Sequence, residues 1–148
     1  MKSFTLRPDT VYHTEISFFK PFQLGKWHCG MSTSDRLPLA RGFDSSFGYL
    51  SGAEDHFKQT RAGFVDFWRD VEPARGENGT AYGAYQYTAE ALRIIRAQGE
   101  RERRRVAVSG DGGEQGEQGD VGSEGGEGRP MFMYLAYQIM HGPNQVCY

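Results

Sequence analysis

The chain has 148 residues, which is enough for one domain. Its 17 Lys and Arg residues against 19 Asp and Glu residues give a formal net charge of -2, which excludes a strongly basic nucleic-acid-binding protein. Two cysteines are too few for a disulfide framework. No stretch approaches the roughly 18 consecutive apolar residues of a membrane-spanning helix, so no membrane segment is expected.

The first pattern that predicts regular structure is SFFKPFQL (17–24), an apolar and aromatic run typical of a strand. It leads into GKWHCG. Because residues i and i+2 share one face of a strand, Lys26 and His28 are expected to point one way and Trp27 the other. A lysine and an imidazole on one face can hold an oxyanion; the alternative is that both are solvated at an exposed strand end. The glycines on either side allow close approach of backbone or ligand.

The middle of the chain predicts less regular structure. Residues 32–57, STSDRLPLARGFDSSFGYLSGAEDHF, are rich in Gly, Ser and aromatics and indicate a structured loop region. Residues 63–74, GFVDFWRDVEPA, indicate a short strand or turn that Pro73 ends. The aromatic residues of the loop region are expected to anchor packing: Phe43, Phe47, Tyr49 and Phe57.

Residues 80–99, TAYGAYQYTAEALRIIRAQG, predict a helix that ends at Gly99. Apolar residues recur at three- and four-residue spacing, which predicts a core-facing stripe. The stripe comprises Tyr82, Tyr85, Ala89, Leu92 and Ile95, with Gln86, Glu90 and Arg93 on the other face.

Residues 99–129 differ in kind, since they contain no aromatic residue and little that could be buried. Such a segment cannot offset its ordering entropy, so it is predicted to be a flexible, low-complexity Gly/Glu-rich linker. From Gly110 to Gly128 a glycine stands at every third position, but collagen also needs prolines and none occurs there. The run RERRR (101–105) could bind polyanions or be a solvated helix tail.

The run MFMYLA (131–136) has the length and continuous apolarity of a strand buried on both faces of a parallel sheet. His141 follows it closely. Ligands of open α/β sheets bind beyond the carboxyl ends of the strands. Lys26, His28 and His141 all follow predicted strands, so we expect them to form one site.

Four stretches together resemble the type I sulfatases, the formylglycine-dependent sulfuric ester hydrolases. They are GKWHCGM (25–31), LPLARGFDSSFGYLSGAEDHF (37–57), YTAEALRII (87–95) and PMFMYLAYQIMHGP (130–143). Their order and spacing are similar to the arylsulfatase B (N-acetylgalactosamine-4-sulfatase) type, with 99–129 as an insertion. The resemblance implies part of an alkaline-phosphatase-like α/β fold, in which a sheet lies between layers of helices.

The resemblance also implies a chemistry and a partner. In this family a formylglycine hydrate attacks the sulfur of a sulfate ester, while calcium and basic side chains neutralise the sulfate oxygens. By motif position, Lys26 would contact sulfate and His28 would hydrogen-bond the formylglycine hydroxyl. His141 would contact sulfate and protonate the leaving alcohol. Lysine supplies a compact positive charge, and histidine transfers protons near neutral pH. The implied partner is a sulfated small molecule or glycan.

Parts of the family pattern are missing from the sequence. No Cys or Ser begins a Cys/Ser-x-Pro-x-Arg motif, and neither of the acidic pairs that bind calcium in the family is present. Cys29 stands where the family usually has Leu, which suggests a small apolar replacement. We therefore expect residues 1–148 to be a single incomplete sulfatase domain, without metal ligands and inactive alone. The alternatives are a non-catalytic remnant that binds sulfate or is inert, and a chain that does not fold stably by itself.

The family resemblance suggests a lysosomal or secreted protein. No signal peptide is visible in the sequence. The tripeptide Asn78-Gly79-Thr80 is a glycosylation sequon, and Asn78 is a possible glycosylation site only if the protein is secreted.

Overall fold

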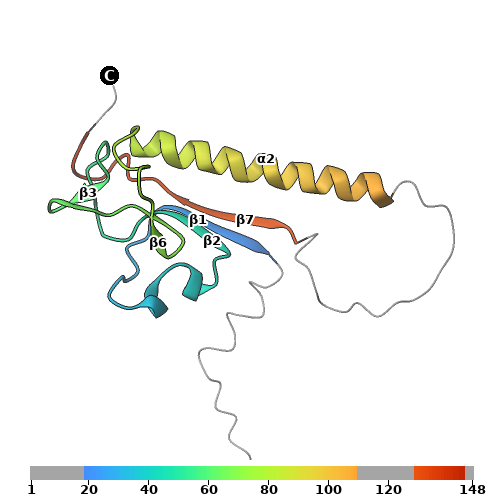
Figure 1. The fold of residues 1–148 in the computed structure, drawn as a ribbon, viewed down its shortest axis with the longest axis horizontal. Coiled ribbons are helices and arrows are strands. Elements are labelled where there is room, and N and C mark those ends of the chain that lie inside the picture. Colours follow the sequence, from blue (N-terminus) through green and yellow to red (C-terminus); the bar gives the residue numbers. More distant parts are fainter. Residues whose placement is uncertain (1–18, 110–128, 146–148) are drawn as a thin grey trace, which may run out of the picture.

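A computed structural model describes residues 19–109 and 129–145 and gives them a mixed α/β fold (Figure 1). The order of the five-stranded sheet is β6-β5-β2-β1-β7. Its strands are β1 (Lys20–Lys26), β2 (Ser45–Tyr49), β5 (Trp68–Arg69), β6 (Glu72–Pro73) and β7 (Met131–Ala136). The other elements are the hairpin of β3 (Thr60–Arg61) and β4 (Phe64–Val65), the 3-10 helices η1 (Ser34–Arg36) and η2 (Leu39–Arg41), and helix α2 (Gly83–Ser109). The predicted α/β class is confirmed.

The two faces of the sheet are covered differently. Helix α2 lies along one face, and the short helices η1 and η2 lie on the other side (Figure 1). On that second side the rings of Trp27 and Phe43 meet edge to face at 5.8 Å, and Phe43 lies 6.4 Å from the ring of Tyr134. Within the described residues α2 is the only α-helix, so the predicted layering of a sheet between helices is not established by this structure.

The loop prediction for residues 32–57 was wrong at its centre, where Ser45–Tyr49 forms strand β2. This strand pairs parallel with β1 and antiparallel with β5, so it lies inside the sheet. The strand is hard to recognise from its composition, because Ser and Gly are unusual in a central strand. Gly48 is required by the close approach of β1: a Cβ there would lie 2.0 Å from the carbonyl oxygen of Gly25.

Strand β7 occurs where it was predicted and pairs parallel with β1. It lies at the end of the sheet order, and its two faces differ. Met131, Met133 and Leu135 pack against the core, whereas Phe132 and Tyr134 are 49% and 45% exposed. The prediction of burial on both faces was therefore wrong for this chain, because the second face has only partial cover.

Helix α2 was predicted, but its end and its buried face were not. The helix continues through Gly99 to Ser109, so 99–109 is not a flexible linker. Gly99 costs about 1 kcal/mol in a helix, but the arginines that follow it are good helix formers, and Glu102 pairs with Arg105 one turn on. The rest of the predicted linker, 110–128, lies outside the described residues.

The buried face of α2 carries Tyr87, Ala91 and Ile94, next to the predicted stripe rather than on it. Of that stripe Tyr82 is buried, but Ala89 is exposed and Tyr85, Leu92 and Ile95 are all more than 40% exposed. Glu90, predicted on the face opposite the stripe, is buried, and ion pairs with Arg69 and Arg93 compensate its charge. Two apolar stripes occur on this helix, and only packing against the sheet selects between them.

The predicted strand or turn at 63–74 forms β4, β5 and β6 in succession. Pro73 does not end the structure but lies within β6, at the end of the sheet order. Proline is tolerated there because an outer strand has backbone positions that need no donor.

The core lies between the sheet and α2. Among the predicted anchors, Phe47 and Tyr49 are buried, Phe43 is half-buried, and Phe57 is 40% exposed. The rings of Phe47 and Phe67 meet at 4.8 Å, and Tyr87 of α2 contacts both. The cluster comprises Leu24, Phe47, Tyr49, Phe67, Ala74, Tyr87, Ala91 and Ile94. No helix in the described part of the chain combines the length and apolarity needed to cross a membrane.

Candidate functional site

Strands β7, β1 and β2 run parallel, so their carboxyl ends lie at the same end of the sheet. In register, Gly25 is opposite both Gly48 and Ala136, and Lys26 is opposite Tyr49. Lys26 is the last residue of β1 at this end, His28 comes shortly after it, and His141 follows β7. The structure therefore brings the three predicted residues to one end of the sheet, although among the described residues none of their side chains hydrogen-bonds another.

The local geometry of Lys26 and His28 differs from the expected alternation. Strand β1 ends at Lys26, and His28 has a φ of 49°, in the left-handed region. The strand rule that predicted a common face therefore does not extend to His28. Trp27 is buried, and its indole nitrogen donates to the carbonyls of Gly30 at 3.1 Å and Arg36 at 2.9 Å.

The loop after β2 supports His28. The amide of His28 donates to the carbonyl of Leu50 at 3.1 Å, and its ring lies over Gly52. The ring lies close to Gly52, since a Cβ there would be 2.8 Å from His28 Nε2, so a side chain at residue 52 would displace this imidazole. The Asp66 carboxylate fixes the same loop by accepting the amides of Leu50 at 3.1 Å and Ser51 at 2.9 Å.

Gln23, which was not identified from the sequence, supports the end of β1 through its side chain. Its side chain is 2% exposed, and its amide nitrogen donates to the carbonyls of Gly25 at 3.1 Å and Lys26 at 3.3 Å. The end of the strand is thus held by hydrogen bonds, which leaves the half-exposed Lys26 side chain to solvent or a ligand.

His141 lies in an exposed turn after β7. Its amide donates to the carbonyl of Gln138 at 2.7 Å, and its ring Nδ1 lies 2.8 Å from the carbonyl oxygen of Gly142. A carbonyl oxygen only accepts, so this contact requires a proton on Nδ1. The other ring nitrogen, Nε2, is then the atom at which a proton can be gained or lost.

A buried polar network lies beneath this turn, and sequence reasoning missed it. Gln138 is 4% exposed and bonds to both backbone groups of Glu54. Glu54 is 3% exposed, and its Oε1 accepts a 2.5 Å hydrogen bond from the hydroxyl of Tyr87. His56, also 3% exposed, stacks on Tyr82 and lies 3.1 Å from the Gln138 amide nitrogen. Only Gln138 follows a predicted strand, whereas Glu54 and His56 lie in the predicted loop region 32–57, where nothing marked them.

Burial, opposed by the hydrogen bond from the Tyr87 hydroxyl and aided by the nearby Asp66 and Asp55 carboxylates, raises the pKa of Glu54 to about 8. Glu54 Oε2 is buried without a hydrogen-bond partner. The carboxyl is therefore protonated at neutral pH, which is how a buried acid avoids carrying an uncompensated charge.

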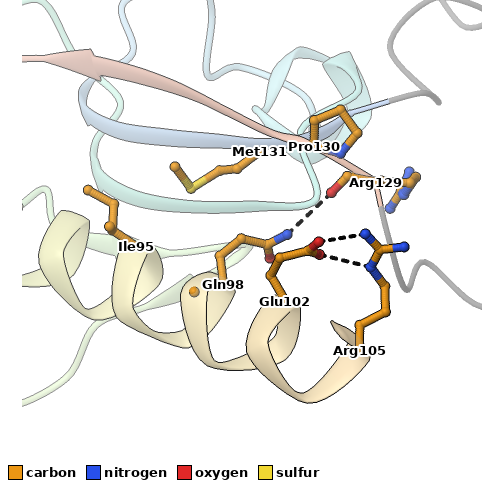
Figure 2. A pocket seen from close by; sticks show the side chains of 8 residues that line it. Ile95, Gln98, Glu102, Arg105, Arg129, Pro130 and Met131 are labelled. Atoms are coloured by element: carbon orange, nitrogen blue, oxygen red, sulfur yellow. Dashed lines mark hydrogen bonds and ion pairs between the residues drawn. The ribbon is translucent and has the colours of Figure 1, made fainter. Parts of the chain in front are cut away.

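A cavity of about 360 Å³ lies elsewhere, between the last turns of α2 and the start of β7. Figure 2 shows Gln98 and Glu102 of the helix facing Arg129 and Pro130, with Arg105 paired to Glu102. Because Met131 is the first residue of β7, this cavity lies at the amino-terminal end of the parallel strands. It is not part of the site that contains Lys26 and His141.

The family resemblance implies a calcium ion, but the described residues provide no matching set of ligands. Within residues 19–109 and 129–145, no group of three His, Cys, Asp or Glu side chains is placed to hold a metal ion. Cys29 is free and exposed, and Cys147 lies outside the described residues. Asn78 lies in a half-exposed turn.

Comparisons with known proteins agree with the sequence resemblance. No family model matches the chain. The curated protein arylsulfatase J of Mus musculus is 26% identical over 132 residues, which cover 86% of this chain. The chain resembles part of a sulfatase. It spans 18% of the length of arylsulfatase J, so the similarity concerns one portion of that protein.

The fold is also shared with a solved structure. The crystal structure of Ps i-CgsB matches with a TM-score of 0.56 and 23% sequence identity, over 87% of this chain and 25% of that chain. At that identity the match supports the fold alone. The similarity to arylsulfatase J confirms the predicted resemblance to sulfatases, and the structural match supports a sulfatase-like fold.

Proposed function

We propose that this chain forms part of a sulfatase domain whose complete form hydrolyses sulfate esters, including those of sulfated sugars. The similarity to arylsulfatase J over 86% of the chain carries the proposal. The fold is compatible with it, because Lys26 ends a parallel strand and His28 and His141 follow such strands, at the end of the sheet where α/β proteins bind ligands.

Each residue has a role that suits its chemistry. Lys26 contacts a sulfate oxygen, where a compact positive charge stabilises developing negative charge. His28 hydrogen-bonds the nucleophile of the complete domain. His141 contacts the sulfate and protonates the leaving alcohol from Nε2, since Nδ1 donates to Gly142. To act as the acid, His141 must carry a proton on both ring nitrogens.

The described residues do not fit a calcium site, so no step is assigned to a metal here. The sequence also has no motif for the formylglycine nucleophile. We therefore predict that the isolated chain does not hydrolyse an aryl sulfate above the buffer rate, with or without added calcium. Clear turnover would show that the chain contains a nucleophile that the motif comparison missed.

Sulfate binding tests the remaining chemistry directly. Titration of the 148-residue chain with inorganic sulfate should show binding that Lys26→Ala weakens by about tenfold or more, the loss of one charge-assisted hydrogen bond. Lys20→Ala is a matched control, because Lys20 lies on the same strand, is also half-buried, and stands at its opposite end. Equal binding by both variants would contradict the proposed role of Lys26.

The second candidate is a non-catalytic sulfatase remnant, favoured by the missing nucleophile motif and the lack of a described metal-ligand cluster. It binds sulfate without cleaving it, or is inert. The same titration distinguishes these outcomes. We further propose a lysosomal or secreted location, on the strength of the family resemblance alone.

A further inference from the structure

The turn that carries His141 has little apolar anchorage. Tyr137, Ile139 and Met140 are 39%, 45% and 95% exposed, so these side chains contribute little burial to hold the turn. An exposed turn of this kind is expected to move unless hydrogen bonds fix it. We propose that Gln138 and Gln145, one on each side of His141, are positioning residues that clamp the turn to residues 54–56. This inference rests on the proposed role of His141.

The first half of the clamp is Gln138. Its Oε1 accepts from the amide of Glu54 at 3.2 Å, and its Nε2 donates to the carbonyl of Glu54 at 2.7 Å. The side-chain amide thus pairs with both backbone groups of one residue, as a neighbouring strand would. Nε2 also lies 3.1 Å from His56 Nε2 and 3.4 Å from the carbonyl oxygen of Gly142, next to His141.

The second half is Gln145. Its Oε1 accepts from the amide of His56 at 2.6 Å, and its Nε2 donates to the Asp55 carboxylate at 2.8 Å. Its backbone carbonyl accepts from the hydroxyl of Tyr82 at 3.0 Å. The two glutamines therefore bond to three successive residues, 54 to 56, over sequence separations of more than 80 residues.

Segment 54–56 is itself fixed to the body of the protein. The Tyr87 hydroxyl of α2 donates to Glu54, and His56 stacks on Tyr82 at a ring distance of 5.4 Å. The clamp therefore connects the His141 turn to helix α2 and, through the preceding loop, to Leu50, which accepts from His28. A rigid connection of this kind keeps two candidate catalytic histidines at a constant separation, as proton transfer requires.

Glutamine suits this role because its amide both donates and accepts and carries no charge into a buried site. Leucine has a similar size but neither function. Gln138→Leu and Gln145→Leu should therefore free the turn while they conserve volume. Gln86→Leu is the matched control. Gln86 also donates two hydrogen bonds, to the carbonyl of Glu77 at 2.6 Å and the hydroxyl of Thr80 at 2.8 Å, and neither partner belongs to the turn.

The experiment is nuclear magnetic resonance of the whole ¹⁵N-labelled chain, without and then with inorganic sulfate. In the wild type, backbone order parameters at 139–142 should be about 0.85, as in rigid structure, and should fall below about 0.6 in Gln138→Leu and Gln145→Leu but not in Gln86→Leu. The response of the His141 imidazole to sulfate should require about tenfold more sulfate in the two clamp variants. The response of His28 should be conserved.

A turn that stays rigid in both clamp variants overturns the proposal. If both variants unfold, hydrogen exchange in the wild type decides. Protection of the Glu54 and His56 amides comparable to that of β1 supports the clamp, and free exchange overturns it. If the wild-type turn is rigid but His141 does not respond to sulfate, the proposed function fails while the clamp stands.

Discussion

The two buried glutamates of this protein should respond to the same substitution with opposite signs. Glu54 and Glu90 are 3% and 7% exposed. Glu54 has one neutral partner, the Tyr87 hydroxyl, whereas Glu90 pairs with the guanidinium groups of Arg69 at 2.9 Å and Arg93 at 2.6 Å. Replacement by glutamine removes the ionisable group and leaves the shape nearly unchanged.

For Glu54, burial raises the pKa from the ordinary value of 4.5 to about 8. At 1.36 kcal/mol per pKa unit, this difference corresponds to about 5 kcal/mol. Between pH 4.5 and 8 the folded state keeps a proton that the unfolded chain releases. The contribution of this group to stability is therefore fully present below pH 4.5 and is lost as the pH rises through 8.

The Glu54→Gln variant has no ionisable group at this position, so it should not show the loss of stability between pH 4.5 and 8 that Glu54 causes. Urea unfolding at pH 5, 6.5 and 8, followed by the fluorescence of Trp27 and Trp68, gives the free energy of unfolding. The advantage of the variant over the wild type should grow by about 1.4 kcal/mol per pH unit above pH 5. A difference that is constant with pH would refute the assignment of a buried, protonated Glu54.

Glu90→Gln is the control with the opposite sign. Burial raises the pKa of Glu90, but hydrogen bonds from Arg93 and Arg69 outweigh it, so the pKa is lowered overall. The ionised Glu90 therefore stabilises the folded state at a pH above its pKa in the unfolded chain. This stabilisation is lost as the pH falls through its pKa in the folded protein. The variant should be about 2 kcal/mol less stable than the wild type at pH 7, and this deficit should shrink below pH 4.5.

Two further predictions concern a glycine and the sequon. Gly48→Ala should prevent folding or cost more than about 3 kcal/mol, because the new Cβ would meet the backbone of Gly25; Gly76→Ala, with a φ of 81° and open space around it, should cost only about 1–2 kcal/mol. Similar thermal unfolding of the two variants would show that the strands can separate. Expression through a secretory pathway should give a glycosidase-sensitive mobility shift that Asn78→Gln abolishes, and its absence would exclude Asn78 as a used site.

The sequence predicted the elements whose patterns are local. Strand β1 and strand β7 are apolar runs of the expected length, and the helix begins near the predicted position. The resemblance to sulfatases also came from motifs that are contiguous in sequence. Helix α2 was predicted too short because Gly99 was interpreted as a stop, although its flanking Arg and Glu residues favour continuation.

Strand β2 was missed because its stability comes from its neighbours. Ser45, Ser46 and Gly48 have low strand propensity, and only pairing with β1 and β5 keeps this segment extended. The same limit applies to the hydrogen bonds between Gln138 and Glu54, because these two residues are 84 positions apart in the sequence. Nothing in a local pattern shows which two distant polar residues will meet.

By itself the sequence determined the α/β class, the positions of β1 and β7, and the similarity to sulfatases, because each depends on residues close together in the chain. Only the tertiary structure decided which stripe of α2 is buried, where Glu54 and Glu90 obtain their partners, and what holds the turn of His141. These depend on the burial and pairing of groups brought together from distant positions, and burial acts on a side chain only once the sheet and helix have packed.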